Sequence, residues 1–462
     1  MFYKKIMIIF IKKTMRFNSL FILILLFTIN SHSQQWRMLF NGINFEGWET
    51  HGGKAIYTID NGIIKGTAVL NSPNTFLCTK EQFTDFIFEA DVFLPNDLNT
   101  GVQFRSNLKE NDRVFGYQFE IDSDGERRWT GGIYDEANRG WLYPLTRNES
   151  AKNSFQLGRW NRIRIECLGN DIRTFVNGVH MSWVIDDETA AGFFGLQVHS
   201  IGKSKEGFSV MWKDIRIATE DIESFRLPTN PRVPQVSYLK NQLTEWEKSK
   251  GFRLLWDGQT TNGWRGAKRD DFPKKGWIIE DGVLTVEATD GGESTSPGDI
   301  VTLKPYSNFE LELEYMLTKG ANSGIKYFVD PSLNKGTGSA IGCEFQILDD
   351  KSHPDAKNGV KGNRTNGSLY DLIPKKVFSK WRQKKPGQWQ KARIVSKDGK
   401  VEHWLNNEKV VEYDRYSHTF EALVNYSKYK NWNNFGRWSE GLILLQDHGD
   451  EVSFRSIKIK EF

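Results

Sequence analysis

The sequence predicts an all-β protein made of two β-sandwich domains in tandem, joined by a short helical linker. Aromatic residues make up 13% of its 462 residues and include 16 Trp, and 41 Gly are spread among short runs in which apolar and polar residues alternate. Residues 86–93, 162–166 and 173–176 are such runs, and this period of two is typical of half-buried strands. A chain of this length exceeds one ordinary hydrophobic core, so we expect more than one domain.

A set of landmarks occurs twice in the same order, which indicates two copies of one domain. The segment Leu39-Phe-Asn-Gly42 reappears as Leu255-Trp-Asp-Gly258, and the distance between matching landmarks grows from 216 to 249 residues along the chain. A period this long indicates duplicated domains rather than a solenoid. The other matching pairs are Gly47-Trp48 with Gly263-Trp264, Asn99-Thr-Gly101 with Asn322-Ser-Gly324, Gly158-Arg-Trp160 with Gly387-Gln-Trp389, and Gly195-Leu-Gln197-Val-His199 with Leu444-Leu-Gln446-Asp-His448.

The landmarks and the composition between them set the expected domain boundaries. We place the first domain over residues 34–220, a linker over residues 221–250 and the second domain over residues 251–462. The linker contains a proline-rich stretch at residues 226–234, and this composition is typical of a connection between domains.

A helix is predicted in the second half of the linker, over residues 237–250. Leu239, Leu243 and Trp246 recur at the spacing of one helix face, and Gly251 follows as a helix stop. We expect this helix to pack between the two domains and to have no part in the chemistry.

Residues 1–33 resemble a secretory signal peptide. Five basic residues precede an apolar stretch at residues 20–29, and Ser31 and Ser33 supply small side chains near the expected cleavage position. The apolar stretch is too short for a comfortable transmembrane helix, so we expect an exported protein, periplasmic or secreted, without stable insertion in a membrane.

Charge argues against a nucleic-acid partner. Loss of the five positive charges of residues 1–33 takes the formal net charge from +4 to about −1, and the sequence carries no basic stripe. Three cysteines, Cys78, Cys167 and Cys343, lie far apart without the spacing of a metal site. An odd number leaves at least one unpaired; we expect buried free thiols, with a Cys78–Cys167 bridge as the alternative.

The stretch 116–142 combines a strand pattern with many charged and aromatic residues. Gln118, Glu120 and Asp122 alternate with apolar residues and therefore share one face of a strand. The second copy repeats the pattern, with Glu344 and Gln346 on the corresponding face. We expect these side chains to face the surface and to line a groove, which is where chemistry or sugar binding is expected.

The ordered landmarks, the strand GYQFEID or GCEFQILDD, the segment Asp355-Ala-Lys-Asn-Gly359 and the closing Leu-Gln-x-His resemble the 3-keto-disaccharide hydrolase family, long known as a domain of unknown function. The resemblance covers both copies. It implies that each domain is a concanavalin A-like jelly roll and that the protein cleaves glycosides already oxidised at C3.

Such a substrate explains which residues a site needs. A ketone at C3 acidifies the hydrogen on C2, so that a base can remove it, the C1 substituent can leave by elimination, and water can then add. The candidate catalytic residues are Glu120 and His199 in the first copy and Glu344 and His448 in the second. A histidine with an ordinary pKa of about 6.5 is a suitable base, whereas a carboxylate gains strength only where it is partly desolvated.

The remaining site residues are expected to bind the substrate. Arg128 and Tyr134 in the first copy, and Lys357 and Tyr370 in the second, are candidates for stabilising enolate charge. An alternative for Arg128 is a solvated ion-pair loop formed with Arg127 and Glu126. The further candidates for substrate binding are Gln118, Asp122, Trp129, Glu136, Arg139, Trp141 and Gln197 in the first copy, and Gln346 and Gln446 in the second.

The chemistry requires no cofactor, although a divalent cation held by Asp349 or Asp350 is an open possibility that ligand spacing does not support. The sequence contains no glycine-rich dinucleotide-binding motif. A separate sugar 3-oxidoreductase is therefore expected to supply the oxidised oligosaccharide or glycoside substrate.

Two other functions stay open. A non-catalytic lectin is compatible with this class of fold. A retaining jelly-roll β-glucanase uses an E-x-D-x-x-E strand, but here Gly125 stands where the last acid is required. The copies also differ, because Glu120 corresponds to Gln346 and Gln118 to Glu344, so the sequence leaves open which copy is catalytic.

Overall fold

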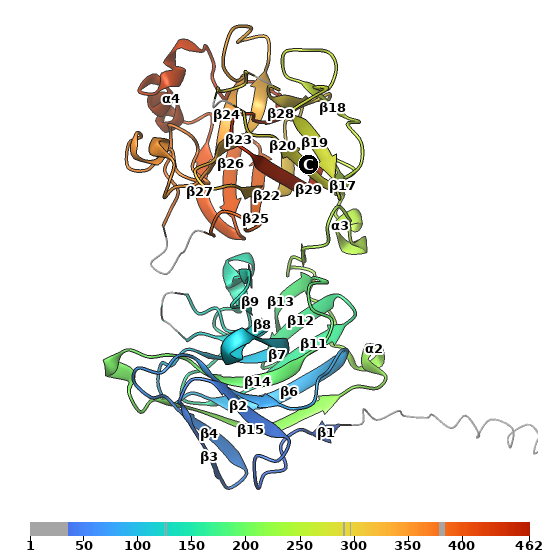
Figure 1. Cartoon of the computed structure of the whole chain (residues 1–462), viewed down its shortest axis with the longest axis vertical. Coiled ribbons are helices and arrows are strands. Elements are labelled where there is room, and N and C mark those ends of the chain that lie inside the picture. The colour runs from blue at the N-terminus through green and yellow to red at the C-terminus, as the bar shows by residue number, and fades with distance from the viewer. Residues whose placement is uncertain (1–35, 124, 126, 290–291, 296, 378–383) are drawn as a thin grey trace, which may run out of the picture. The chain divides into compact units, whose positions relative to one another are not determined.

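A computed structural model describes residues 36–123, 125, 127–289, 292–295, 297–377 and 384–462 of the chain (Figure 1). The predicted signal peptide at residues 1–33 lies outside this described part. None of the described helices is long and apolar enough to cross a membrane.

The first sandwich consists of two facing sheets. The larger sheet carries β1 (Arg37–Met38) on β15, and its strands run in the order β16 (Val236–Ser237), β13 (Val179–Ile185), β12 (Asp171–Val176), β11 (Trp160–Leu168), β6 (Phe86–Phe93), β15 (Ser209–Ala218), β4 (Ile63–Thr67), β3 (Ile56–Asp60). The smaller sheet has the order β10 (Gly140–Tyr143), β9 (Ile133–Glu136), β8 (Arg113–Ile121), β7 (Thr100–Lys109), β14 (Phe193–Val198), β5 (Thr75–Thr79), β2 (Trp48–Gly52).

The second sandwich has the same strand order, but among its described residues the smaller sheet has five strands instead of seven, without counterparts of β9 and β10. Its larger sheet carries β17 (Arg253–Leu254) on β29 and has the order β19 (Trp277–Glu280), β20 (Val283–Val286), β29 (Val452–Glu461), β22 (Phe309–Leu317), β25 (Gln390–Lys397), β26 (Lys400–Leu405), β27 (Glu408–Asp414). Its smaller sheet has the order β18 (Trp264–Gly266), β21 (Ile300–Thr302), β28 (Leu442–Leu445), β23 (Asn322–Asp330), β24 (Ile341–Leu348). The predicted all-β fold of two jelly-roll sandwiches is confirmed.

Each sandwich closes around its own core because strand residues alternate between the two sheet faces. In β8, Tyr117, Phe119 and Ile121 are fully buried in the first core, and Phe345 and Ile347 of β24 are fully buried in the second. Each such side chain contributes roughly 1.5–3 kcal/mol through burial. The alternate residues of these strands therefore face away from the cores, onto the outer face of each smaller sheet.

Short helices complete the fold. They are α2 (Ile222–Phe225), α3 (Glu245–Ser249) and α4 (His418–Asn425), with 3-10 turns η1 (Glu110–Asp112), η2 (Leu145–Arg147), η3 (Glu149–Ala151), η4 (Lys203–Lys205), η5 (Pro354–Lys357) and η6 (Lys428–Asn431). All three cysteines are buried and unpaired, as expected.

The predicted linker helix over residues 237–250 is wrong in its first half. Val236 and Ser237 form β16, which pairs in parallel with β13, and only α3 at the end of the segment is helical. Asn241 adopts a left-handed conformation with φ 52° and exchanges side-chain hydrogen bonds with Gly282 and Ser456. These tertiary bonds override the helical spacing of the apolar residues. The contacts group residues 37–462 into one compact unit.

Candidate functional site

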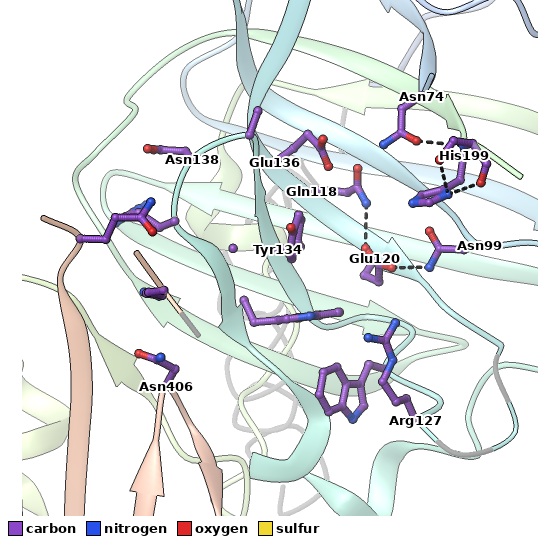
Figure 2. Close-up of a pocket in the computed structure, with 18 of the residues that line it drawn as sticks. Asn74, Asn99, Gln118, Glu120, Arg127, Tyr134, Glu136, Asn138, His199 and Asn406 are labelled. Carbon is purple, nitrogen blue, oxygen red and sulfur yellow. Dashed lines mark hydrogen bonds between the residues drawn. The ribbon is translucent and has the colours of Figure 1, made fainter. Parts of the chain in front are cut away.

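A cavity of about 820 Å³ opens over the outer face of the smaller sheet in the first sandwich (Figure 2). It lies over β8 and β9. The apolar residues of these strands fill the core, so the polar and aromatic residues between them face outward into the cavity. The cavity is lined by Asn74, Asn99, Arg113, Gln118, Glu120, Arg127, Trp129, Tyr134, Glu136, Ala137, Asn138, Arg139, Gly140, Trp141, His199 and Ser200, and by Lys384, Lys385, Gln388, Asn406 and Glu408 from the second sandwich.

Glu120 lies at the centre of the cavity wall. Its side chain is only 4% exposed, and both carboxyl oxygens accept hydrogen bonds. Asn99 Nδ2 donates to Oε1 at 2.6 Å, and Gln118 Nε2 donates to Oε2 at 2.7 Å (Figure 2). A carboxyl group held on both oxygens has one fixed orientation in the cavity.

A chain of amides sets the direction of the bond from Gln118. Ser106 Oγ donates to Gln103 Oε1 at 2.7 Å, and Gln103 Nε2 donates to Gln118 Oε1 at 2.6 Å. Because each amide oxygen accepts from the preceding donor, each amide nitrogen points onward, and the last one points at Glu120.

Gly101 makes room for this chain. It faces Glu120 across the β7–β8 ladder, and a Cβ atom at this position would lie 2.7 Å from the side chain of Gln118. Gly324 has the same place in the second sandwich, where a Cβ atom would lie 2.5 Å from Glu344. A glycine in the middle strand therefore allows the side chain of the neighbouring strand to lean across it.

Burial raises the pKa of Glu120 to about 7, and the nearby carboxylate of Asp122 acts in the same direction. The hydrogen bonds from Asn99 and Gln118 and the charge of Arg127 oppose this rise. The net effect is a carboxyl group whose pKa is raised to near neutral. That is the range in which a general base works best.

Aromatic side chains form the adjoining wall. The rings of Trp129 and Trp141 lie 4.7 Å apart, and those of Tyr134 and Trp141 lie 5.2 Å apart, both edge to face. The Arg127 guanidinium lies over both tryptophans, 4.9 and 5.6 Å from their centroids, and donates to Asp122 Oδ2. This wall offers an apolar surface beside one positive charge.

His199 follows the end of β14 and lines the same cavity as Asn99 and Glu120 (Figure 2). Its Nδ1 is 2.6 Å from the carbonyl oxygen of Ser200, and a carbonyl can only accept, so in the neutral ring Nδ1 carries the proton. The Nε2 lone pair is then the basic position. Asn74 fixes the same turn, because its Oδ1 accepts from the backbone of Ser200 at 2.9 Å.

Charged groups support the far side of the cavity. Arg139 donates to Asp135 Oδ2 at 2.5 Å and also contacts both oxygens of Asp186. Burial raises the pKa of Glu136, while the charge of Arg113 opposes the rise. Arg139 is thus held mainly by protein carboxylates, whereas Glu136 adds a second carboxyl group at the cavity wall.

The second sandwich gathers a different set of residues on the corresponding face. Glu344 is 4% exposed, and its Oε2 lies 3.7 Å from Lys326 Nζ. Burial raises the pKa of Glu344, although Lys326 opposes the rise. Gln446 Nε2 donates to Glu293 Oε1 at 3.0 Å, and the rings of His448 and His353 lie 6.3 Å apart.

Asp349 and Asp350 accept hydrogen bonds from the protein. Asp349 accepts from the backbone of Gly320 at 2.9 Å, and Asp350 accepts from Lys375 Nζ at 2.5 Å. Within the described ranges, no three His, Cys, Asp or Glu side chains are arranged to hold a metal ion.

A profile of the 3-keto-alpha-glucoside-1,2-lyase-like domain matches residues 35–218 and 251–460. The chain belongs to this family. A 3-keto-disaccharide hydrolase from Bacteroides thetaiotaomicron is 39% identical to it over 231 residues, which are 46% of this chain and 78% of that protein. A solved structure from Parabacteroides distasonis, classed as a glycosyl hydrolase, is 32% identical and covers 48% of this chain and 100% of its own, with a TM-score of 0.43.

The structure brings most of the predicted residues of the first copy together. Eight of them line the cavity: Gln118, Glu120, Trp129, Tyr134, Glu136, Arg139, Trp141 and His199. In the second copy Glu344, Gln346 and Gln446 are buried, and Tyr370 donates to Asp355 Oδ2 at 2.8 Å.

Several expectations are corrected by the geometry. Glu120 and Glu344 are buried rather than surface-facing. Arg128 is exposed and donates to Asn153 at 2.8 Å outside the cavity. Arg127 lines the cavity in the position that was expected for Arg128. Glu126, the expected ion-pair partner, lies outside the described residues. His199 and His448 follow the ends of β14 and β28 rather than lying within a strand.

Other predicted residues lie away from the cavity surface. Asp122 is buried behind Arg127, and Gln197 is buried within the sheet face; neither lines the cavity in the described part of the chain. Lys357 is exposed on η5. The residues that were missed are Asn74, Asn99, Arg113, Arg127, Lys384 and Glu408; of these, Asn99 stood within the repeated Asn-x-Gly landmark and could have been found.

Proposed function

We propose that this protein is a hydrolase that cleaves 3-keto-glycosides by elimination and water addition, and that the reaction takes place in the cavity of the first sandwich. The family and the relative from B. thetaiotaomicron support glycoside cleavage. The observation that carries the proposal is Glu120, a buried carboxyl group oriented by two donors in a large polar and aromatic cavity.

Glu120 acts as the base in the first step. It removes the proton from C2, and the electrons of the C–H bond form an enolate with the negative charge on the C3 oxygen. The enolate then re-forms the ketone, a double bond forms between C1 and C2, and the C1–oxygen bond breaks. A base with a pKa of about 7 suits this step, because the proton is acidified only by the ketone.

The walls of the cavity stabilise the charge that develops. The Arg127 guanidinium provides a fixed positive charge, and Tyr134 and Asn99 provide polar groups beside Glu120. Charge is stabilised more strongly in a partly desolvated cavity than in water. The rings of Trp129 and Trp141 supply an apolar surface for the faces of sugar rings.

Water then adds to C1 of the unsaturated ketone, and C2 regains a proton. Glu120, whose carboxyl proton exchanges with solvent before this step, gives a proton to C2, so the net reaction is hydrolysis of the glycosidic bond. His199, with Nε2 as its basic atom, is the second candidate base and lines the cavity, where it can act on the entering water.

The second sandwich is an alternative place for the reaction. The observation that favours it is the buried Glu344–Lys326 pair, which places a base next to a positive charge. If this site is the active one, Glu344→Gln and His448→Ala abolish turnover, and Glu120→Gln does not.

The experiment that tests the function compares oxidised and parent substrates. Purified protein is expected to release sugar from a 3-keto-glucoside and to leave the parent glucoside intact. A lectin would bind the parent sugar and leave both intact, and a β-glucanase would cleave the parent. The proposal also requires a sugar 3-oxidoreductase in the same exported compartment, because the enzyme itself makes no ketone.

A further inference from the structure

A hairpin of the second sandwich reaches the cavity of the first. Strands β26 and β27 are joined by Asn406 and Asn407, and Leu405 pairs directly with Glu408. Both asparagines are left-handed, with φ of 51° and 68°, as a two-residue hairpin loop requires, and asparagine tolerates this conformation better than most residues.

Hydrogen bonds fix the tip of this hairpin to the first sandwich. Thr146 Oγ1 donates to the carbonyl oxygen of Asn407 at 2.9 Å. The Asn407 side chain donates to the carbonyl oxygen of Leu142 at 3.0 Å and to the hydroxyl of Tyr238 at 2.9 Å. The residue that follows Asn407 is therefore held in a defined position relative to the cavity.

That residue is Glu408, which lines the same cavity as Glu120. Its side chain is 5% exposed, and among the described residues no group donates to its buried Oε2. The equivalent hairpin of the first sandwich, between β12 and β13, has Val179 at this place, and Val179 is 41% exposed. The hairpin itself therefore does not require an acid here.

A buried carboxyl group without a hydrogen-bond donor is stable mainly in its protonated form. Burial raises the pKa of Glu408 to about 7, while the charges of Arg127 and Lys152 oppose the rise. Glu120 differs because two amides donate to it, which favours its ionised form. The two carboxyl groups of this cavity therefore differ in their hydrogen bonding: two donors stabilise the carboxylate of Glu120, and none reaches the buried oxygen of Glu408. This difference suits Glu120 to act as a base and Glu408 to act as an acid.

We propose that Glu408 is the general acid that protonates the leaving group, so that the second sandwich completes the active site of the first. This inference rests on the proposed function. In the elimination step, Glu120 takes the C2 proton while the Glu408 hydroxyl gives its proton to the oxygen that leaves C1. In the addition step, Glu408 takes a proton from water as the water oxygen bonds to C1, and Glu120, after exchange of its proton with solvent, protonates C2. Both carboxyl groups end as they began.

A general acid matters most for a poor leaving group, and this dependence provides the test. The full-length wild type and Glu408→Gln are compared on 4-nitrophenyl 3-keto-glucoside, whose leaving group needs no proton, and on methyl 3-keto-glucoside, whose leaving group does. We expect the variant to lose at least 100-fold in kcat/KM on the methyl substrate and less than tenfold on the nitrophenyl substrate. Glu412→Gln, on the exposed end of the same strand, is the matched control and is expected to behave as wild type.

Equal losses on both substrates would mean that Glu408 only shapes the cavity, and equal rates would mean that it has no role; either result overturns the inference. Glu408→Asp provides a second variant if the glutamine variant does not fold, and it should keep the same substrate dependence in a weaker form. A wild type that cleaves neither 3-keto substrate would instead overturn the proposed function.

Discussion

Glu120 shows how burial and hydrogen bonding together prepare one residue for chemistry. An exposed glutamate is fully ionised at neutral pH and is a weak base, whereas Glu120 has its pKa raised to about 7 by burial. The donors Asn99 and Gln118 limit the rise and fix the orientation of the carboxyl group. The same burial that makes Glu120 a stronger base also lowers the free energy of unfolding at neutral pH, because the charged carboxylate is desolvated in the folded protein.

Replacing Glu120 by glutamine is expected to lower kcat by 10²–10⁴-fold, the usual contribution of a general base, because an amide cannot accept the C2 proton. The variant should fold, since glutamine keeps the volume and removes a buried carboxyl group. Steady-state assays on a 3-keto-glucoside measure the effect, with circular dichroism to show that the variant is folded. Near-wild-type turnover by the folded variant would exclude Glu120 as the base.

The raised pKa also predicts how stability depends on pH. The folded-state pKa of Glu120 is about 7 and the unfolded-state value is about 4.3, so the folded protein holds the proton more tightly and loses stability as pH rises between these values. Urea unfolding of the wild type at pH 4.5 and 7.5 should show this loss, and Glu120→Gln should reduce it by roughly 1–3 kcal/mol. An unchanged difference between the two pH values would show that the carboxyl group is not desolvated.

The sequence pattern predicted that Glu120 lies on the outer face of its strand, because it alternates with the apolar residues Phe119 and Ile121. The pattern could not show whether a polar residue on that face is buried or exposed. A solvated ion-pair loop stayed open as an alternative for Arg127 and Arg128, because adjacent arginines look alike in the sequence until one of them stacks on Trp129. Glu408 lies 288 residues from Glu120 in the chain, and only tertiary structure brings it to the same cavity.

At the scale of elements, the smaller sheet of the first sandwich works as a support for side chains that cross from strand to strand. Gly101 of β7 has no side chain on the outward face, and the side chain of Gln118 of β8 occupies the space above it. The amide chain from Ser106 to Glu120 depends on this gap. Backbone and side chains are therefore matched across neighbouring strands.

Gly101→Ala tests that dependence. The added Cβ would meet Gln118 at 2.7 Å and the Phe119 carbonyl oxygen at 2.8 Å, so the ladder must shift. We expect a loss of about 1–3 kcal/mol in unfolding free energy, typical of overpacking, together with a fall in kcat. Gly202→Ala, where a Cβ meets nothing within 4 Å, is the control and should leave both quantities unchanged.

The hairpin of β26 and β27 is the second element on which the site depends. Asn407→Gly keeps the left-handed backbone and removes the donations to Leu142 and Tyr238. We expect about 0.5–3 kcal/mol of lost stability from these two bonds and a lower kcat/KM, measured by urea unfolding and by the 3-keto-glucoside assay. A variant as stable and as active as wild type would mean that the hairpin is not held by these bonds.

Elements were predicted well where period and turn residues agree, as in β6, β8 and β11. The linker helix was not predicted correctly, because its apolar residues have helical spacing while the residues before α3 bond to both sandwiches. The backbone of β16 pairs with β13, and the Asn241 side chain bonds to Gly282 and Ser456. Leu239 and Trp246 pack on the first core, so their apolar character reflects tertiary contacts rather than a helix face.

At the scale of the whole molecule, two sandwiches with one strand order carry different outer faces. Thr100 donates to the Gln197 carbonyl and Ser323 to the Gln446 carbonyl, so the frames correspond closely. The residues on these frames have diverged, with amides around Glu120 and a lysine beside Glu344. The ordered landmarks predicted the two strand frameworks. They did not predict which outer face carries the cavity, because the amides around Glu120 and the lysine beside Glu344 are both compatible with a polar sheet face.

This divergence predicts unequal effects of matched variants. Glu344→Gln is expected to leave turnover of a 3-keto-glucoside within about twofold of wild type, because Glu344 lies outside the cavity of Glu120, whereas Glu120→Gln is expected to lower it by about 10²–10⁴-fold. Parallel kinetic assays of the two folded variants decide the point. The reverse pattern would place the reaction in the second sandwich.

The central claim is that a ketone at C3 allows this protein to cleave a glycosidic bond with Glu120 as the base. The most direct measurement follows the C2 hydrogen: wild-type protein is incubated with a 3-keto-glucoside in D₂O, and the released sugar is examined by NMR. Elimination and addition predict deuterium at C2 of the product and the parent glucoside left intact, and the role of Glu120 predicts turnover about 10²–10⁴-fold slower for Glu120→Gln. Cleavage that retains hydrogen at C2, or cleavage of the parent glucoside at an equal rate, would contradict the account.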